Sequence, residues 1–349
     1  MLEYRKYNYE TYILPLWEGD TVYNESIMFV DEKEAPLFYY PQKVISVLSP
    51  DLKTEYIEGE DFIVEDDKIK LTENSRIFVT TLEEFFPENP KEGTYFETTV
   101  PGYKYIMFGE GDFMFKRQVF VTYTHKDAWN SFLPSKSYKF DKFIKKAENG
   151  EDLNVLFYGD SITYGANSSG IMGFEPFAES YCQMVNTTFS KKFPQSKFNY
   201  LNTALGGANV IWGLDNLQEL AIDKKPDLMI LAFGMNDPDK TGEVFADYVK
   251  AILDKFFAAC PDCPVAVVST MLPHFRLKGF WGNQQYHENA LKSLLLSYEN
   301  AELIPMTSVH KALLERKRYY DMSGNNVNHP NDFLARVYAQ TINKVILGI

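Results

Sequence analysis

Hydrophobic and polar residues follow two different rhythms along the chain, and the rhythm changes near residue 140. Up to about that point the sequence is rich in Tyr, Phe, Val, Ile and Thr, interrupted every several residues by Gly, Pro, Asn or Asp. This spacing is typical of short antiparallel strands joined by turns. Residues 61–71 predict two strands around an acidic turn, and residues 118–124 predict another strand. We therefore expect residues 1–140 to form an all-β sandwich of the jelly-roll kind, without an evident helical face.

Beyond residue 140 the pattern becomes strand followed by helix. A short connecting helix is predicted over 142–150, because Phe143, Ile144 and Ala147 have helical spacing and Gly150 is a stop signal. Alternating strands and helices predict a parallel sheet covered by helices on both faces, here an α/β domain over residues 150–349. The expected strands are 154–158, 198–202, 228–233, 264–270 and 302–305, and the expected helical regions are 174–193, 209–221, 242–259, 283–299 and 331–346.

Polar turns follow the predicted strands at several places. Gly159-Asp160-Ser161 ends the first strand of the second half, Gly206-Gly207 lies in a later turn, and Gly234-Met235-Asn236-Asp237 follows the strand 228–233. His329 stands in a turn-rich loop just before the last helix. Because sites in such sheets form at the carboxyl ends of the strands, we expect these residues to converge on one edge of the sheet.

Ser161 is the candidate nucleophile of this edge. A Gly-Asp-Ser turn is also ordinary punctuation after a strand, since Gly permits unusual backbone angles and Asp or Ser can cap a helix. A serine hydroxyl needs an adjacent base at neutral pH, and His329 carries the side chain whose ordinary pKa suits that task. Together the two residues predict acyl transfer through an acyl-serine intermediate.

Size and charge narrow the range of partners. A chain of 349 residues predicts two domains, each long enough to bury a core of its own. The net charge of −13 repels phosphate backbones and anionic membranes, so nucleic acid is not an expected partner.

No apolar run reaches the length of a membrane span, and the first residues lack the apolar core of a signal peptide. We expect a cytoplasmic protein, or a secreted one if a signal peptide has been removed.

The spacing of the cysteines does not indicate a metal site. The chain has three cysteines, and Cys260-Pro261-Asp262-Cys263 has the spacing of half a zinc site or of a redox motif. No second cysteine pair or suitable histidine cluster accompanies it, so we interpret it as a turn between a helix and the next strand. We expect no cofactor and no metal ion.

The second half of the chain resembles a known superfamily, the SGNH hydrolases, also called GDSL-like esterases and lipases. The first conserved block of that family resembles Gly159-Asp160-Ser161-Ile162, and its second block resembles residues 202–208. The third block resembles Gly234-Met235-Asn236-Asp237, and the last resembles His329-Pro330. The resemblance implies a flavodoxin-like, three-layer fold for residues 150–349. It also implies Ser161 as nucleophile, His329 as base, and an oxyanion hole made by the backbone N–H groups of Ser161 and Gly207 and the side chain of Asn236.

One position departs from the family pattern. The usual aspartate three residues before the histidine is replaced by Asn326. Candidates for orienting His329 are therefore Asn326 through its amide oxygen, a backbone carbonyl, Asp321 or Asp332. The two-part layout resembles carbohydrate esterase family 2, whose members deacetylate polysaccharides and can work with a serine–histidine dyad. We expect a dyad with a neutral orienting group.

The expected function is a serine esterase that removes small acyl groups, acetyl first, from carbohydrate. His274, Trp281 and Trp212 are candidate substrate-binding residues, although a loop histidine and packed tryptophans are the ordinary alternatives. Other interpretations are a lipase-like acylhydrolase, a thioesterase, or a carbohydrate-binding protein that has lost catalysis. The expected partner is a small-molecule or carbohydrate ester, and the sequence leaves the oligomeric state open.

Overall fold

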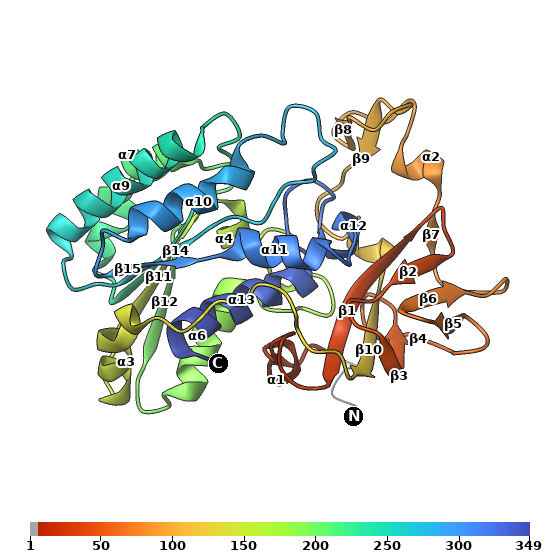
Figure 1. Cartoon of the computed structure of the whole chain (residues 1–349), viewed down its shortest axis with the longest axis horizontal. Helices are drawn as coiled ribbons and strands as arrows, with labels where there is room; N and C mark the ends of the chain where they lie inside the picture. Colours follow the sequence, from red (N-terminus) through yellow and green to blue (C-terminus); the bar gives the residue numbers. More distant parts are fainter. Residues whose placement is uncertain (1–5) are drawn as a thin grey trace.

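The computed structural model describes residues 6–349 and places a β-rich part beside a part built on a parallel sheet (Figure 1). The parallel sheet has the strand order β12-β11-β13-β14-β15, and every neighbouring pair runs parallel. This is the doubly wound order 2-1-3-4-5 of flavodoxin-like folds, and it confirms the predicted fold class. The strands are β11 (Leu153–Gly159), β12 (Phe198–Asn202), β13 (Leu228–Ala232), β14 (Val265–Val268) and β15 (Ala301–Ile304).

Helices cover both faces of this sheet, because its central strand is apolar on both sides. Val155 and Phe157 of β11 pack in the cluster that includes α3, α6, α11 and α13, whereas Leu156 and Tyr158 pack in the cluster with α7, α8, α9 and α10. The helices are α3 (Asp141–Glu148), α6 (Tyr181–Lys192), α7 (Val210–Asp215), α8 (Leu217–Leu220), α9 (Gly242–Ala259), α10 (Gln284–Leu295), α11 (Met306–Leu314) and α13 (Asp332–Leu347).

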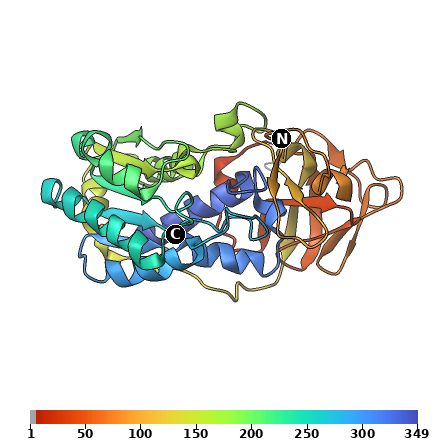
Figure 2. The same ribbon diagram turned by 90° about the horizontal axis from the view of Figure 1, so that it is seen from above.

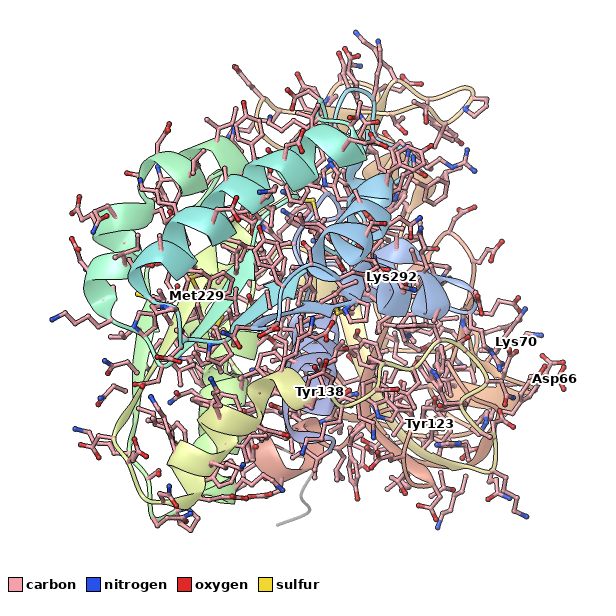
Figure 3. The ribbon with its side chains drawn as sticks, turned by 60° about the vertical axis from the view of Figure 1, so that its left-hand side comes forward. Asp66, Lys70, Tyr123, Tyr138, Met229 and Lys292 are labelled. Atoms are coloured by element: carbon pink, nitrogen blue, oxygen red, sulfur yellow. The ribbon has the colours of Figure 1, made fainter. Side chains whose placement is uncertain are left out.

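The β-rich part contains a five-stranded sheet in the order β4-β3-β10-β1-β7, a three-stranded sheet β2-β6-β5 and the hairpin β8-β9. The strands are β1 (Thr21–Val30), β2 (Glu34–Pro36), β3 (Pro41–Leu48), β4 (Glu55–Tyr56), β5 (Phe62–Glu65), β6 (Lys68–Leu71), β7 (Val79–Thr80), β8 (Tyr95–Glu97), β9 (Tyr105–Met107) and β10 (Gln118–His125). Two short helices, α1 (Tyr9–Tyr12) and α2 (Leu82–Phe85), interrupt it. In Figure 3, Asp66 and Lys70 mark the outer hairpin β5–β6, Tyr123 the large sheet, and Met229 the parallel sheet.

Most element boundaries follow the predicted ones, but α6 begins later than expected. Its helical pattern predicts a start at 174, whereas the helix starts at Tyr181. Ser180 accepts a hydrogen bond from the backbone N–H of Gln183, and the Gln183 side chain accepts one from the N–H of Ser180. This capping box fixes the first turn, and the apolar residues before it belong to a loop instead.

The largest cluster of buried apolar residues draws members from both sides of residue 140. Helix α13 is buried along almost its whole length, because the N-terminal segment covers its outer side. The Gln340 side chain donates to the backbone carbonyls of Tyr12 at 2.9 Å and Leu14 at 2.8 Å. Figure 2 shows the β-rich part at one end of the parallel-sheet part. The division into domains 1–140 and 150–349 stays a prediction.

The segment between α11 and α13, which contains the short helix α12 (Tyr319–Met322) and carries His329, rests on β1 and β10. Lys317 and Glu25 form an ion pair of 2.5 Å in which both side chains are fully buried. Tyr123 donates its hydroxyl to Glu25 at 2.6 Å, and Asp321 accepts the backbone N–H of Met28 at 2.9 Å. The β-rich part therefore supports the segment that carries the histidine.

Among residues 6–349, the structure has no helix that combines the length and the apolar character needed to cross a membrane.

Candidate active site

Ser161 is delivered by a tight junction between β11 and the short helix α4 (Ser161–Tyr164). A Cβ on Gly159 would collide with the carbonyl oxygen of Ala232 and with the hydroxyl of Thr163, so glycine allows β11 and β13 to end close together. Asp160 caps α4 by accepting the N–H of Ile162 at 3.0 Å. The serine is therefore held at the carboxyl end of a central strand, with 8% of its surface exposed.

His329 meets Ser161 at this edge. Its Nε2 lies 2.9 Å from the serine Oγ, although 168 residues separate the two in sequence. The His329 loop is closed by Asn325, whose side-chain oxygen accepts the backbone N–H groups of residues 327, 328 and 329 at 3.0, 3.0 and 3.1 Å. The Gly324 N–H donates to the carbonyl of His329 at 2.9 Å. These bonds fix the direction from which the imidazole approaches the serine.

The other ring nitrogen, Nδ1, faces three side chains. The Asn167 Oδ1 lies 2.7 Å away, the Asn325 Nδ2 3.0 Å, and the Glu110 Oε2 3.3 Å. The Asn167 amide nitrogen is turned toward the carbonyls of Gly111 and Gly324, at 3.3 and 3.0 Å, so its oxygen faces the ring. The Asn325 amide donates to Glu110 at 3.1 Å and to Asn328 at 2.9 Å.

This network assigns the histidine tautomer. Both amide hydrogens of Asn325 have other acceptors, whereas Asn167 offers an acceptor oxygen, so Nδ1 carries the hydrogen and donates it to Asn167. Nε2 is then left unprotonated and accepts the hydroxyl of Ser161. That arrangement is the one in which a histidine can act as a base toward a serine.

Asn326, one of the candidates for orienting His329, makes no hydrogen bond to its ring in this structure. Its amide donates to the backbone carbonyl of Met107 at 3.0 Å, and its backbone adopts a left-handed conformation with φ 66°. Asp321 is bonded to Arg318 and to the N–H of Met28, and Asp332 accepts the N–H of Ser169 at 2.9 Å. All three side chains thus bond to groups other than His329, and the buried Asn326 Oδ1 has no hydrogen-bond partner.

Asn167 takes the place beside the ring for which Asn326 was one of the candidates. It lies in the loop after α4, and its backbone also has positive φ, at 64°. Sequence reasoning missed it because no short-range spacing connects it with a histidine 162 residues away. Its nearness to Ser161 in the chain is the one available signal.

The expected oxyanion donors are also brought to this edge. The Asn236 amide donates to the carbonyl of Ala208 at 2.9 Å, which places it beside Gly207. Gly207 has φ 77°, and no atom lies within 4 Å of where its Cβ would be, so its backbone is open to an approaching group. The Leu205 N–H donates to the carbonyl of Gly159 at 3.1 Å and ties this turn to the end of β11. The predicted convergence of the strand ends is confirmed.

Burial shapes the acid–base properties of the groups around the serine. Burial raises the pKa of Asp160 to about 7, despite the hydrogen bond that it accepts from Ile162. Burial alone would raise the pKa of Glu110 as well, but the hydrogen bond from His329, and the positive charge of that ring when it is protonated, hold the pKa of Glu110 below its ordinary value. Burial lowers the pKa of His274 to about 3, so this imidazole is neutral at physiological pH.

The three candidate substrate-binding residues differ in their surroundings. His274 is buried, accepts the N–H of Arg276 at 3.1 Å, and donates its own backbone N–H to Val327 at 2.9 Å, which supports the His329 loop. Trp212 packs against Tyr158, with ring centres 6.0 Å apart. Trp281 is partly exposed. Contact of these residues with a substrate stays a prediction.

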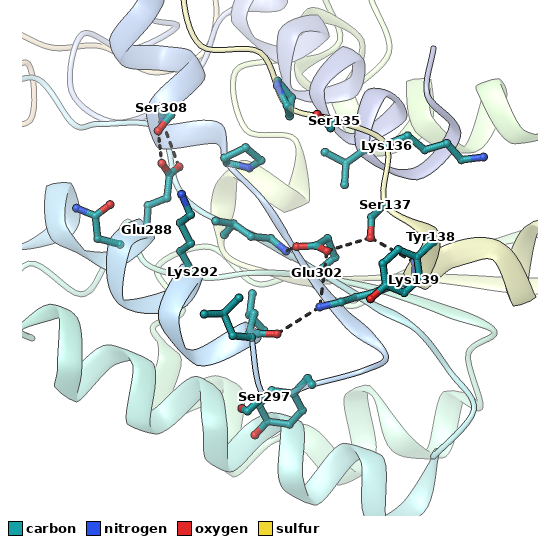
Figure 4. Close-up of a pocket in the computed structure, with 18 of the residues that line it drawn as sticks. Ser135, Lys136, Ser137, Tyr138, Lys139, Glu288, Lys292, Ser297, Glu302 and Ser308 are labelled. Atoms are coloured by element: carbon teal, nitrogen blue, oxygen red, sulfur yellow. Dashed lines mark hydrogen bonds and ion pairs between the residues drawn. The ribbon is translucent and has the colours of Figure 1, made fainter.

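A large cavity of about 880 Å³ lies elsewhere, along the edge strand β15, and its lining includes neither Ser161 nor His329. Figure 4 shows Ser137 and Lys139 of the connecting segment beside Glu302, and Ser308 beside Glu288. The Ser137 hydroxyl donates to Glu302 at 2.9 Å, and Lys139 lies 3.6 Å from the same carboxylate. Among its charged groups, Lys139 and Glu302 thus pair with each other, and Glu288 accepts hydrogen bonds from Ser308.

The cysteine motif is a turn, as the sequence predicts. Cys260 caps the end of α9, Cys263 lies buried just before β14, and both are free thiols. Within the described part of the chain, no group of three or more His, Cys, Asp or Glu side chains is placed to hold a metal ion.

Comparison with known structures shows a shared fold. A two-domain esterase active on acetylated mannans is 24% identical with a TM-score of 0.50, over 60% of this chain and 53% of that chain. Its complex with mannopentaose gives 25% identity, a TM-score of 0.49, and coverage of 59% and 52%. A catalytic mutant of an acetylxylan esterase from Geobacillus stearothermophilus is 14% identical, with a TM-score of 0.48, over 57% of this chain and 96% of that chain. The match thus spans about half the length of the two-domain esterase.

Sequence comparisons give a family. No curated protein matches the chain. The model of the GDSL-like Lipase/Acylhydrolase family matches residues 157–336, more than half of the chain and a range that contains Ser161, Gly207, Asn236 and His329. The chain therefore belongs to the GDSL-like lipase/acylhydrolase family.

Proposed function

We propose that this protein is a serine esterase that removes small acyl groups, acetyl first, from carbohydrate. The observation that carries the proposal is the 2.9 Å contact between Ser161 Oγ and His329 Nε2, with the opposite ring nitrogen donating to Asn167. A serine–histidine pair with the histidine held in this tautomer is the minimal apparatus for acyl transfer.

The reaction begins when Ser161 attacks the ester carbonyl carbon. His329 Nε2 takes the hydroxyl proton as the new C–O bond forms, and negative charge moves to the carbonyl oxygen. The backbone N–H groups of Ser161 and Gly207 and the amide of Asn236 are the donors for that oxyanion. Fixed donors of this kind stabilise the transition state because they need no reorganisation when the charge appears.

The intermediate then collapses. The ester C–O bond breaks, and the proton on His329 passes to the departing alcohol oxygen, leaving an acyl group on Ser161. Water attacks this acyl-serine while His329 takes one of its protons, and the acid is released with the serine regenerated. Asn167 and the backbone of the His329 loop keep the ring in place through both halves of the cycle.

The immediate surroundings of the serine support a sugar ester as the substrate. Tyr164 lies three residues after Ser161 on α4, hence on the same side of that helix, and 55% of its surface is exposed. Leu205, just before the Gly206-Gly207 turn, is 50% exposed. The aromatic ring offers a flat face on which a sugar ring can rest, and the leucine adds apolar surface beside it. The two-domain esterase with the same fold acts on acetylated mannans, which makes these the first substrates to test.

The experiment compares purified wild type with Ser161→Ala on acetylated manno- and xylo-oligosaccharides and on aryl esters of increasing chain length. We expect release of acetate by the wild type, a rate that falls with acyl length, and no turnover by Ser161→Ala. Ser190→Ala, on the exposed side of α6, is the control and should behave as wild type. Faster hydrolysis of long-chain esters or of thioesters would assign a lipase-like or thioesterase function instead. Binding of the sugars without acetate release would assign a carbohydrate-binding protein.

A further inference from the structure

A carboxylate of the β-rich part lies against the active-site histidine. Glu110 stands in the loop after β9, 219 residues before His329, and its Oε2 lies 3.3 Å from the ring Nδ1. The His329 side chain is only 11% exposed, and that of Glu110 is 46% exposed. The negative charge thus sits at the mouth of the site, on the side of the ring away from Ser161.

The position of Glu110 is fixed from several directions. Its other oxygen, Oε1, accepts the Asn325 amide at 3.1 Å, and Asn325 also binds the backbone of the His329 loop. The carbonyl of the next residue, Gly111, accepts the Asn167 amide at 3.3 Å. The same two asparagines that surround the imidazole therefore hold the loop that carries Glu110.

The hairpin from which this loop emerges is itself anchored to the parallel-sheet part. Thr98, after β8, pairs with Leu277, and Lys278 forms an ion pair of 2.8 Å with Glu97. The Met107 carbonyl at the end of β9 accepts the amide of Asn326, the residue that replaces the family aspartate. Asn326 is thus used to bind the segment that delivers a carboxylate from another part of the chain.

We propose that Glu110 is a positioning residue that supplies, from the β-rich part, the negative charge that the family aspartate would give to His329. This inference rests on the proposed function. Asn167 orients the neutral ring, and Glu110 stabilises the imidazolium that forms when the Ser161 proton moves to Nε2. No proton passes to Glu110: the hydrogen on Nδ1 stays on the ring throughout. The β-rich part is then a component of the catalytic apparatus and not only a support.

The charged groups that face His329 are few, which makes the role testable. Glu110 approaches from the β-rich loop and Asp160 from the end of β11, whereas Asn167 and Asn325 are neutral. Removing the Glu110 charge leaves Asp160 and both amides in place. The imidazolium should then form less readily, so the acid limb of the pH–rate profile should move to lower pH while the maximal rate falls.

The experiment compares Glu110→Gln, Glu110→Asp and Asp112→Asn with the wild type. Asp112 is the matched control, since it is a carboxylate of the same loop whose ion-pair partner is Lys116. We expect Glu110→Gln to lower kcat by about tenfold to a hundredfold, the range for losing one interaction with a charged group, with KM changed less than about twofold. Glu110→Asp should recover part of the loss. Asp112→Asn should cause none of these changes. Thermal unfolding of each variant checks that the fold is retained.

A second readout is the pH dependence of kcat. Its acid limb should lie at lower pH in Glu110→Gln than in wild type and should stay in place in Asp112→Asn. Equal kcat values and equal pH profiles for Glu110→Gln and wild type overturn the inference while leaving the esterase proposal standing. A change in KM alone reassigns Glu110 to substrate contact and also overturns it. Absence of any ester hydrolysis by the wild type defeats the proposed function itself.

Discussion

The side-chain oxygen of Asn167 lies 2.7 Å from Nδ1 of His329, and this contact decides which ring nitrogen faces Ser161. The amide cannot turn over without presenting its N–H groups to the ring and its oxygen to the carbonyls of Gly111 and Gly324. A neutral side chain thus performs the orienting task that a carboxylate performs in the usual triad, and the charge is left to another residue.

Asn167→Ala should lower kcat by roughly fivefold to a hundredfold, because the imidazole loses its nearest acceptor and its Nδ1–H is left with only the longer contact to Glu110. KM should change little, since Asn167 lies behind the ring. Steady-state kinetics on an aryl acetate measures both quantities. The paired variant Asn326→Gly tolerates the left-handed backbone at that position and removes only the bond to Met107, so it should lower kcat less than Asn167→Ala does. If Asn326→Gly instead proves the more damaging of the two, the assignment of the orienting residue is mistaken.

Asn236→Ala should reduce kcat by about a hundredfold to a thousandfold, the loss expected on removing one oxyanion donor. Asn300→Ala is a matched control, since Asn300 also donates to a backbone carbonyl, that of Pro261 at 2.9 Å, and lies just before the amino end of β15, at the end of the sheet opposite the site. It should leave kcat unchanged. Equal activity of Asn236→Ala and wild type would remove Asn236 from the oxyanion hole.

Lys317→Met should destabilise the fold by about 3 to 5 kcal/mol, because it leaves the fully buried Glu25 carboxylate without its partner. Chemical unfolding gives the free energy directly. Lys250→Met breaks an exposed pair with Asp254 and should change the stability by less than about 1 kcal/mol. Similar effects of the two substitutions would mean that the buried pair does not join β1 to the His329 loop as described.

Asp160→Asn should stabilise the protein at neutral pH and above, and less in acid. The folded pKa of Asp160, about 7, lies above its unfolded value, so the folded state binds more protons and its stability falls as pH rises through that interval. Asparagine keeps the cap of α4 without the buried charge. The difference in unfolding free energy between variant and wild type should grow from pH 4 to pH 8, to at most about 4 kcal/mol. A difference independent of pH contradicts this account of the carboxylate.

The sequence predicts much of the fold because local signals are strong where elements begin and end. Helix α9 occupies 242–259 as expected, since Thr241 caps it and its apolar residues recur at helical spacing. The strand at 198–202 is likewise as expected. The convergence of Ser161 and Asn236 follows from strand order, because the carboxyl ends of parallel strands share one edge. His329 lies in the loop before α13, so its arrival at this edge depends on how that loop packs against β1 and β10.

The contacts of His329 Nδ1 could not be predicted in the same way. Asn167 and Glu110 reach the ring from loops 162 and 219 residues away, and no periodicity or spacing rule links such segments. The burial of α13 on all sides has the same origin, since the segment that covers it comes from the start of the chain. The family pattern drew attention to position 326, but tertiary packing turns that side chain toward β9 instead.

Covalent labelling tests most directly whether Ser161 and His329 act together. The wild type and His329→Ala are treated with a fluorophosphonate, and the modified residue is located by peptide mass spectrometry. We expect rapid labelling of the wild type at Ser161 alone and a rate at least about a hundredfold lower in His329→Ala, because the serine then lacks its base. Labelling at another residue, or an equal rate in both proteins, would contradict the account.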